Sequence, residues 1–104
     1  MSCNVTIVNK AVSPTILTLL VEDREDGELT GKGKVIFSRE IRAYSTATSN
    51  VGQPLAMIGI SNREYQPGEL VDLDILTNKT NMDCGQPRVT ATWTTNNMFE
   101  IRYQ

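Results

Sequence analysis

Two aspartates in the segment LVDLDIL, Asp72 and Asp74, are the nearest approach in this sequence to a pair of catalytic carboxylates. Their spacing places both on one face of a strand, and two carboxylates flanking a substrate can hydrolyse a glycosidic bond. The same alternation, with Val71, Leu73 and Ile75 pointing inward, describes the solvent side of an ordinary strand. Because the chain has no histidine, Ser-His and Cys-His nucleophiles are excluded within one protomer. We therefore predict that the protein is not an enzyme, and a carboxylate-dependent hydrolase ranks last among the alternatives.

The segment EDREDGE, residues 22–28, packs five carboxylates around Arg24. A calcium loop of the EF-hand type needs aspartates at alternate positions, glycine at the sixth position and glutamate at the twelfth. Counting from Asp23, the sixth position is Glu28, so the segment does not follow that pattern. We predict a solvated hairpin tip with an Asp26-Gly27 turn and no metal site; divalent-cation binding by these carboxylates is the alternative.

Composition limits the class of protein. At 104 residues the chain predicts one domain, residues 1–104, and its 39% apolar and 21% charged content is that of a soluble globular protein. A net charge of −2 and a pI near 5.0 argue against a nucleic-acid partner. No cofactor motif, signal peptide or membrane-spanning apolar run is visible. The expected location is the cytoplasm, or the exterior by a route that needs no visible signal.

The two cysteines, Cys3 and Cys84, are a candidate disulfide. They can bond only if the first strand lies beside the loop that carries Cys84, with Cα atoms about 4.4–6.8 Å apart. Without an export signal, two reduced thiols are the favoured expectation. Two cysteines without a histidine cannot complete a four-ligand zinc site unless carboxylates or a partner chain contribute.

Strand patterns dominate the elements that would position these residues. The β-branched or alternating segments are 4–9, 15–22, 34–48 (one bent strand or two), 54–60 and 70–76, and Gly59 predicts a bulge or close packing. Gln66-Pro67-Gly68-Glu69 has the composition of a type II turn. We therefore predict an all-β fold: a single-domain antiparallel β-sandwich, immunoglobulin-like or jelly-roll-like, of about 6–8 strands with little or no helix.

The C-terminal segment RVTATWTTNNMFEIRYQ predicts a hairpin whose register can be chosen from the pattern. A two-residue loop would set Trp93 beside charged side chains. A three-residue loop, Thr95-Asn96-Asn97, pairs Trp93 with Phe99 and separates apolar from polar faces. Asparagine also suits the left-handed position of such loops. We predict the three-residue loop and a buried Trp93.

That register leaves Thr90, Thr92 and Thr94 together on the opposite face. A row of hydroxyls is a candidate surface for carbohydrate, ice or a partner strand. The alternative is a plain solvated sheet face, where threonine is simply a good strand former.

The opening VTIVNK, residues 5–10, followed by polar hairpins and a C-terminal strand pair, resembles the small membrane-binding β-sandwiches of the aegerolysin type. The resemblance implies a membrane- or lipid-binding protein, such as a toxin or hemolysin. Such a protein needs exposed aromatic side chains at one end, and Tyr44 and Tyr65 are the candidates.

The first functional hypothesis is a non-enzymatic recognition module that binds a protein or carbohydrate partner, with no cofactor, and that forms a homo-oligomer if an outer strand is free to pair. The candidate surfaces are the loop from Asp23 to Lys34, the loop from Thr77 to Pro87 and the threonine face. Their binding residues are Asp23, Arg24, Glu25, Asp26, Lys32, Lys34, Lys79, Asn81, Thr90, Thr92 and Thr94. The membrane-binding β-sandwich is the second hypothesis.

Overall fold

The computed structural model describes residues 2–104, and strands make up most of it. In chain order the elements are β1 (Cys3–Asn9), β2 (Thr15–Glu25), β3 (Glu28–Ile41), β4 (Thr46–Val51), β5 (Leu55–Ile60), β6 (Leu70–Asp72), the 3-10 helix η1 (Leu73–Ile75), β7 (Thr77–Asp83), β8 (Arg88–Trp93) and β9 (Phe99–Tyr103). Within residues 2–104, no helix combines the length and apolarity needed to cross a membrane.

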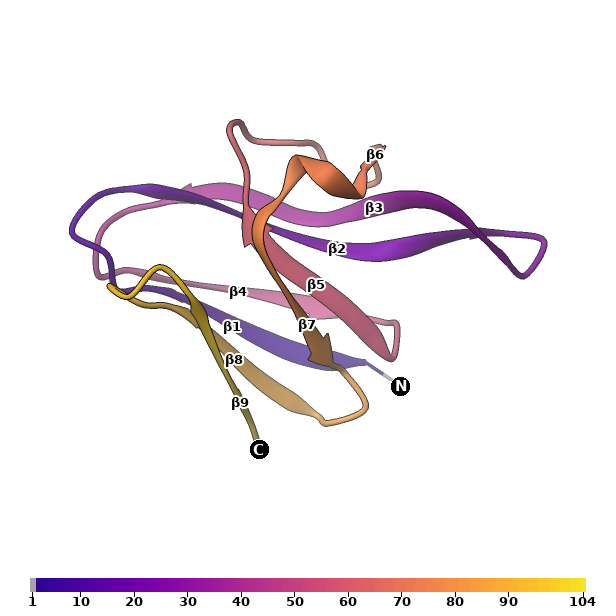
Figure 1. Cartoon of the computed structure of the whole chain (residues 1–104). Coiled ribbons are helices and arrows are strands. Elements are labelled where there is room, and N and C mark those ends of the chain that lie inside the picture. Colours follow the sequence, from indigo (N-terminus) through magenta and orange to yellow (C-terminus); the bar gives the residue numbers. More distant parts are fainter. Residues whose placement is uncertain (1) are drawn as a thin grey trace.

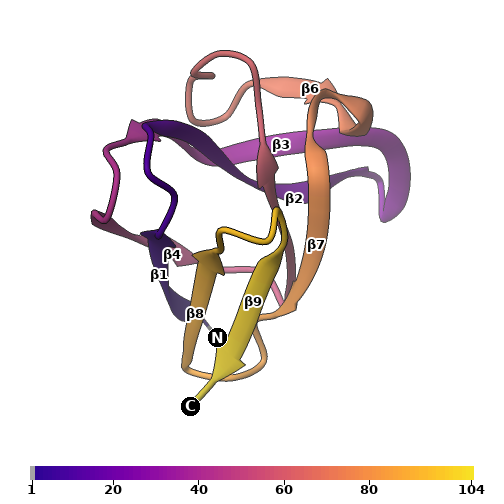
Figure 2. The same cartoon turned by 60° about the vertical axis from the view of Figure 1, so that its left-hand side comes forward.

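The strands form two facing sheets (Figures 1 and 2). Sheet A has the order β4-β1-β8-β9, and sheet B has the order β6-β3-β2-β5-β7. Neighbouring strands are antiparallel except β1 and β8, which run parallel. The predicted all-β sandwich is confirmed. The described residues hold nine strands rather than six to eight, because residues 34–48 contribute to two strands and residues 77–83 form another.

The main core lies between the sheets and is filled by alternate residues of each strand. In β1, for example, Cys3, Val5 and Ile7 are fully buried, whereas the residues between them face outward. At 25 cal/mol per Å², each buried Val or Ile side chain stabilises the fold by roughly 1.5–3 kcal/mol. Period-2 burial of this kind fixes which face of β1 is solvated.

A second core covers the outer surface of sheet B. Leu19 and Leu20 are both fully buried because consecutive side chains point to opposite faces of β2 and both faces are covered: Leu19 joins the main core and Leu20 joins the second one. Val35 of β3 and the segment of residues 61–76 supply the rest of the second core. This explains why the run TILTLLVE is continuously apolar rather than alternating.

The C-terminal hairpin has the predicted register. Trp93 pairs with Phe99, and the backbone N–H of Thr94 donates to the carbonyl of Met98 at 3.0 Å, which leaves a three-residue loop. Asn97 has a φ of 58°, as that loop requires. Trp93 is 7% exposed and its ring lies 4.9 Å from that of Phe99, so the prediction of a buried tryptophan is confirmed.

Cys3 and Cys84 form a disulfide, with their Cα atoms 5.3 Å apart. The structure therefore differs from the reduced thiols that the missing export signal favoured. The reason is topological: the turn that contains Cys84 leads into β8, and β8 pairs with β1 from the point where the Asn4 N–H donates to the Pro87 carbonyl at 2.9 Å, so Cys84 comes beside the start of β1. The disulfide joins sheet A to sheet B.

The segment 70–76 is not the continuous strand that its alternation predicted. It forms the three-residue β6 and then the 3-10 helix η1, closed by the Leu76 N–H and the Leu73 carbonyl at 3.5 Å. Leu73 and Ile75 still pack against the second core. A short helix can bury alternate residues as a strand does, so the pattern did not separate the two.

Two smaller predictions from turn chemistry agree with the structure. Gly68 has a φ of 89° and the Glu69 N–H donates to the Gln66 carbonyl at 3.0 Å, as in a type II turn. Gly59 lies at a register shift in β5, where an added Cβ would stand 2.8 Å from the Cβ of Leu76. The predicted bulge with close packing is therefore present.

Candidate functional site

The outer surface of sheet A carries a neutral polar array, called here the polar face. Because alternate residues of β4, β1 and β8 are buried, the residues between them point to solvent in register. One row across the sheet is Thr48, Thr6 and Thr90. The polar face consists of Asn4, Thr6, Thr46, Thr48, Asn50, Thr90 and Thr92.

The interior of the polar face is uncharged. Neither β1 nor β4 contains a charged residue. On these two strands the amide of Asn50 donates to the side-chain oxygen of Asn4 at 2.9 Å. Charges begin only at the border, with Arg88 on β8 and the exposed Arg102–Glu100 ion pair on β9 at 2.7 Å. Apart from Val8, which lies between Thr46 and Thr92, the chemistry of the face is therefore that of hydroxyls and amides, which both donate and accept hydrogen bonds.

Two shallow depressions mark this surface. The first lies over one end of the polar face and is lined by Asn4, Thr6, Thr48, Asn50 and Thr90, among others. The second lies at the other end, where Val8 pairs with Thr46 and Thr92. It is lined by Val8, Lys10, Tyr44, Thr94 and Thr95.

The aromatic ring of Tyr44 is 70% exposed at this second depression. The backbone of Tyr44 has a φ of 59°, an uncommon conformation for a bulky residue. Tyr65, the other aromatic residue proposed for a membrane-facing end, is only 8% exposed. That prediction is wrong for Tyr65, because its ring fills the second core.

The predicted threonine row is only partly available for binding. Thr90 and Thr92 lie half-buried on the polar face. Thr94 lies past the end of β8, where its hydroxyl donates to the Met98 carbonyl at 3.0 Å and accepts from the Asn96 N–H at 3.3 Å. Its hydroxyl is therefore engaged in closing the hairpin loop.

Five members of the polar face were not predicted from the sequence: Asn4, Thr6, Thr46, Thr48 and Asn50. A local signal for two of them exists, because the tripeptide Thr-Ala-Thr occurs at both 46–48 and 90–92. Both copies turn the alanine inward and the threonines outward, although Ala47 is only partly buried and Thr90 and Thr92 are half-buried. Their adjacency to β1 follows from strand order, which the pattern does not reveal.

The predicted loop of residues 23–34 is instead a strand hairpin. The ends of β2 and β3 pair out to Glu25 and Glu28 and close on the Asp26-Gly27 turn, where φ is 53° and 82°. Figure 1 shows this hairpin extending well past the other strands of the sandwich, and we call residues 22–34 the arm. The predicted hairpin tip is present, but the segment is ordered by strand pairing.

Several side chains of the arm form hydrogen bonds within the arm itself. The hydroxyl of Thr30 donates to the carboxylate of Asp23 at 2.9 Å, and Arg24 donates to the Gly27 carbonyl at 3.0 Å. Lys32, nearer the sandwich, forms an ion pair with Asp72 at 2.9 Å. Among the described residues, no group of three or more Asp, Glu, His or Cys side chains gathers to hold a metal ion.

The other predicted sites are dispersed. The supposed loop 77–87 is mostly strand β7, and Lys79 and Asn81 are exposed on it. Lys79 lies 4.0 Å from Asp74, whereas Asn81 helps to line a cavity of about 190 Å³ together with Arg24 and Leu55. The structure thus brings Asn81 near Arg24, but neither residue lines the depressions on the polar face.

Asp72 and Asp74 do not form a carboxylate pair. Asp72 ends β6 and is 72% exposed beside Lys32, whereas Asp74 belongs to η1 and is fully exposed. Neither lines the cavity beside Arg24 and Asn81 or the two depressions at the polar face. The arrangement gives no support to hydrolysis by these two residues.

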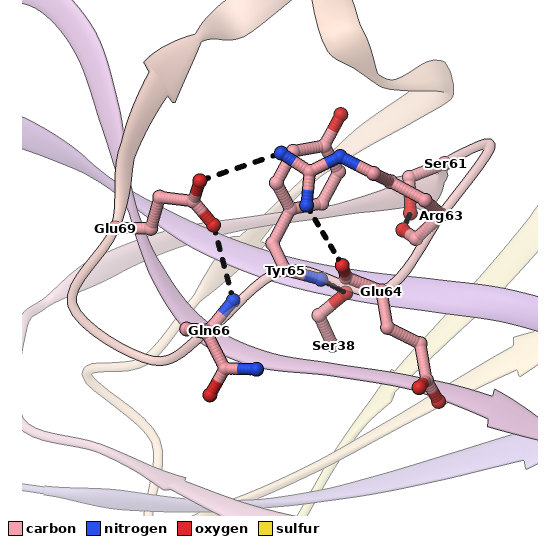
Figure 3. Close-up of polar contacts among 7 residues, drawn as sticks. All are labelled: Ser38, Ser61, Arg63, Glu64, Tyr65, Gln66 and Glu69. Carbon is pink, nitrogen blue, oxygen red and sulfur yellow. Dashed lines mark hydrogen bonds and ion pairs between the residues drawn. The ribbon is translucent and has the colours of Figure 1, made fainter.

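A buried chain of three hydroxyls, those of Ser38, Thr18 and Ser61, holds the loop that follows β5. Figure 3 shows the contacts of its two serines with that loop. The Thr18 hydroxyl lies 2.7 Å from both Ser38 and Ser61. The single proton of Ser61 goes to the Arg63 carbonyl at 2.9 Å, so Thr18 must donate to Ser61, and Ser38 must then donate to Thr18. Ser38 in turn accepts from the Tyr65 N–H at 2.9 Å. All bonds therefore run in one direction.

This chain of hydroxyls is structural in its contacts. Within residues 2–104, no carboxylate, lysine or arginine side chain bonds to any of the three hydroxyls, so none has an activating base. Above it, Arg63 lies 3.8 Å over the ring of Tyr65 and pairs with Glu69 at 3.4 Å (Figure 3). These contacts lie within the loop, whereas the bonds of Thr18 and Ser38 to Ser61 and Tyr65 attach the loop to sheet B.

Comparison of the chain with protein-family models, curated proteins and solved structures found no match.

Proposed function

We propose that the protein is a non-enzymatic recognition module that binds a neutral glycan through the polar face. One observation carries the proposal: three adjacent strands place seven hydroxyl and amide side chains on one sheet surface, with no charge on β1 or β4. A sugar ring presents hydroxyl groups, which can donate hydrogen bonds to these side chains and accept hydrogen bonds from them. Such a contact buries no unpaired charge.

Tyr44 supports the same proposal. Its exposed ring stands at the depression that borders the polar face, beside Val8 and Lys10. A ring with a polar tip offers a large apolar surface at a low cost in side-chain entropy. The apolar side of a sugar ring can stack on it while the sugar hydroxyls contact Thr92 or Thr46 on the same surface.

The test is binding of an array of neutral oligosaccharides, followed by titration of any hit with detection by amide NMR. Thr6 lies at the centre of the polar face, between Thr48 and Thr90. Thr6→Val keeps the shape and removes one hydroxyl, so we expect affinity to fall about three- to tenfold. Thr80→Val is the matched control, since Thr80 is a half-buried strand threonine of sheet B.

Two outcomes would contradict the proposal. One is a chain that binds none of the oligosaccharides. The other is binding whose shifted amides lie outside β4, β1 and β8, or binding that Thr6→Val and Thr80→Val weaken equally.

A protein partner is the second candidate, and the arm is the observation that favours it. Five carboxylates and one arginine occupy residues 22–28, at the end of a hairpin that projects from the sandwich. A projecting charged hairpin can reach a basic surface and steer its approach. The test is a pull-down from native lysate, comparing the full chain with one in which register partners Glu22 and Gly33 are joined by Asn-Gly. If the shortened chain retains every partner, the arm is not the site that binds a protein partner.

A further inference from the structure

The edge of β4 is open and uncharged. Of the other sheet edges, β7 and β9 contact each other and carry charged side chains, which hinder pairing, and the edge beside β3 is covered or short. At the β7 and β9 edges, the Asp83 N–H donates to the hydroxyl of Tyr103 at 3.0 Å, and the amide of Asn78 donates to the Asn97 carbonyl at 3.1 Å. These contacts join the two edge strands across the sandwich. Free donors and acceptors on an edge strand are a template for pairing, so natural sheets usually shield them in such ways.

The edge beside β3 is also covered. Its outer backbone groups are met by residues 61–69: the Glu40 N–H donates to the Glu64 carboxylate at 2.8 Å, and the Val35 N–H donates to the Glu69 carbonyl at 2.9 Å. Farther along, β6 pairs over only three residues before the chain turns into η1. Neither region leaves a long free edge.

The backbone direction of β1 identifies which groups of β4 are free. The Asn9 N–H donates to the Ser45 carbonyl, whereas the Asn4 N–H donates to the Pro87 carbonyl on the β8 side. Because N–H groups alternate sides along a strand, the odd residues of β1 face β4. Their register partners Ala47, Ser49 and Val51 are therefore bonded to β1.

It follows that Thr46, Thr48 and Asn50 direct their N–H and carbonyl groups away from β1, to the open side. Within the described residues, none of these six backbone groups has a hydrogen-bond partner. The strand TATSNV also carries no charge, no proline and no register shift, so it lacks the usual devices that prevent pairing.

We propose that two copies of this chain associate by antiparallel pairing of their β4 edges about a two-fold axis at Thr48. In this register Thr48 faces itself, and Thr46 faces Asn50 of the second copy. Each of these three pairs exchanges two backbone hydrogen bonds, so all the free groups of both strands are used. A displacement by one residue would set these residues opposite Ala47 or Ser49, whose backbone groups are bonded to β1, and a displacement by two residues would leave part of the edge unpaired.

The side chains of β4 are compatible with this register. On the inner side, Ala47 faces Ser49 of the second copy, and both residues are small. On the outer side, Thr46 and Asn50 can exchange side-chain hydrogen bonds. No like charges meet, and a second copy supplies a strand of the same length with the same free groups, as an isologous interface requires.

Pairing would join two copies of sheet A into one sheet of eight strands. The row Thr90, Thr6, Thr48 of one copy would continue into Thr48, Thr6 and Thr90 of the second. The dimer depends on the backbone edge alone, so it does not rest on glycan binding. If the polar face does bind a repetitive glycan, two joined faces raise its avidity.

The test uses opposite charges at the two-fold axis. Thr48→Lys and Thr48→Glu each place two like charges opposite each other, on residues whose Cα atoms would lie about 5.5 Å apart. We expect each variant to raise the dimer dissociation constant at least about tenfold. A mixture of Thr48→Lys with Thr48→Glu should dimerise again as a heterodimer. Thr90→Lys and Thr90→Glu, on the same face but away from the edge, are the matched controls and should remain dimeric.

Light scattering after size-exclusion chromatography measures the molar mass, and amide hydrogen exchange measures the protection of the backbone N–H groups at the β4 edge. In the dimer, the amides of Thr46, Thr48 and Asn50 should gain protection as concentration rises, whereas those of Thr90 and Thr92 should not change. Circular dichroism checks that each variant is folded. A wild-type chain that stays monomeric up to millimolar concentration overturns the proposal, and so does a dimer that Thr48→Lys leaves intact or that the mixture of charges does not restore.

Discussion

Thr18→Val should be the most damaging change of a single hydroxyl in the described structure. Valine keeps the branched shape and nearly the volume of threonine, but it removes the middle link between Ser38 and Ser61. Two hydrogen bonds of 2.7 Å are lost, and the Ser38 proton and a Ser61 lone pair lose their partners. Both serines are less than 9% exposed, so water replaces the bonds poorly.

The magnitude follows from these losses. A net hydrogen bond contributes about 1 kcal/mol, and leaving a buried polar group unpaired costs about 1–3 kcal/mol. We therefore expect Thr18→Val to lower the free energy of unfolding by about 2–3 kcal/mol. Urea unfolding followed by the fluorescence of Trp93, the one tryptophan, measures this as a shift of the midpoint at constant slope.

The control is Thr92→Val, since the Thr92 hydroxyl lies on the polar face and makes no hydrogen bond to the described residues. We expect it to change stability by less than about 0.5 kcal/mol. A double-mutant cycle of Thr18→Val with Ser38→Ala should give a coupling energy of about 0.5–3 kcal/mol, because the two hydroxyls share one chain. If Thr18→Val unfolds within about 0.5 kcal/mol of the wild type, the one-directional chain is refuted.

Two further predictions concern stability. Reduction of the Cys3–Cys84 disulfide, whose partners are 81 residues apart, should destabilise the fold by about 4 kcal/mol. Thermal unfolding with and without a thiol reductant measures this loss. The variant with serine at both positions should unfold like the reduced protein, and the reductant should not change its stability. Gly59→Ala should cost about 1–3 kcal/mol in urea unfolding, since the new Cβ would lie 2.8 Å from that of Leu76, whereas Gly52→Ala, with no atom within 4 Å, should cost far less.

The C-terminal hairpin could be predicted in full because its information is local. Only one register of residues 88–104 separates apolar from polar side chains, and the loop that this register requires suits asparagine at position 97. Sequence pattern and turn chemistry agree there, so the pairing of Trp93 with Phe99 needed no knowledge of the rest of the chain.

The segment 70–76 was mispredicted because an alternating pattern shows which side chains are buried, but it does not show whether they belong to a strand or to a short helix. Leu73 and Ile75 pack on the outer surface of sheet B, in a second core that no single segment of sequence announces. The neighbouring Leu19 and Leu20, buried on opposite sides of β2, belong to the same arrangement. Their continuous apolar run was a sign that both faces of that strand are covered.

The polar face was only half visible for a different reason. Thr90 and Thr92 follow from the hairpin, but Thr6 joins them through a parallel pairing between strands about 80 residues apart in sequence, and Thr48 joins through the opposite side of β1. Strand order is a long-range property, and period-2 patterns carry no information about it.

The polar face depends on where β1 is held, and the disulfide lies at the position that holds it. Cys3 begins β1, and Cys84 lies just before the turn into β8. Asn4, which follows Cys3, donates its N–H to the Pro87 carbonyl at 2.9 Å. This bond starts the parallel ladder that aligns Thr6 with Thr90. A parallel pair has no hairpin turn to set its register, so a covalent link at its first residue takes that role. Loss of the disulfide therefore acts on the alignment of the hydroxyl rows as well as on stability, and it leaves the register of the β8–β9 hairpin, which its own loop determines, unchanged.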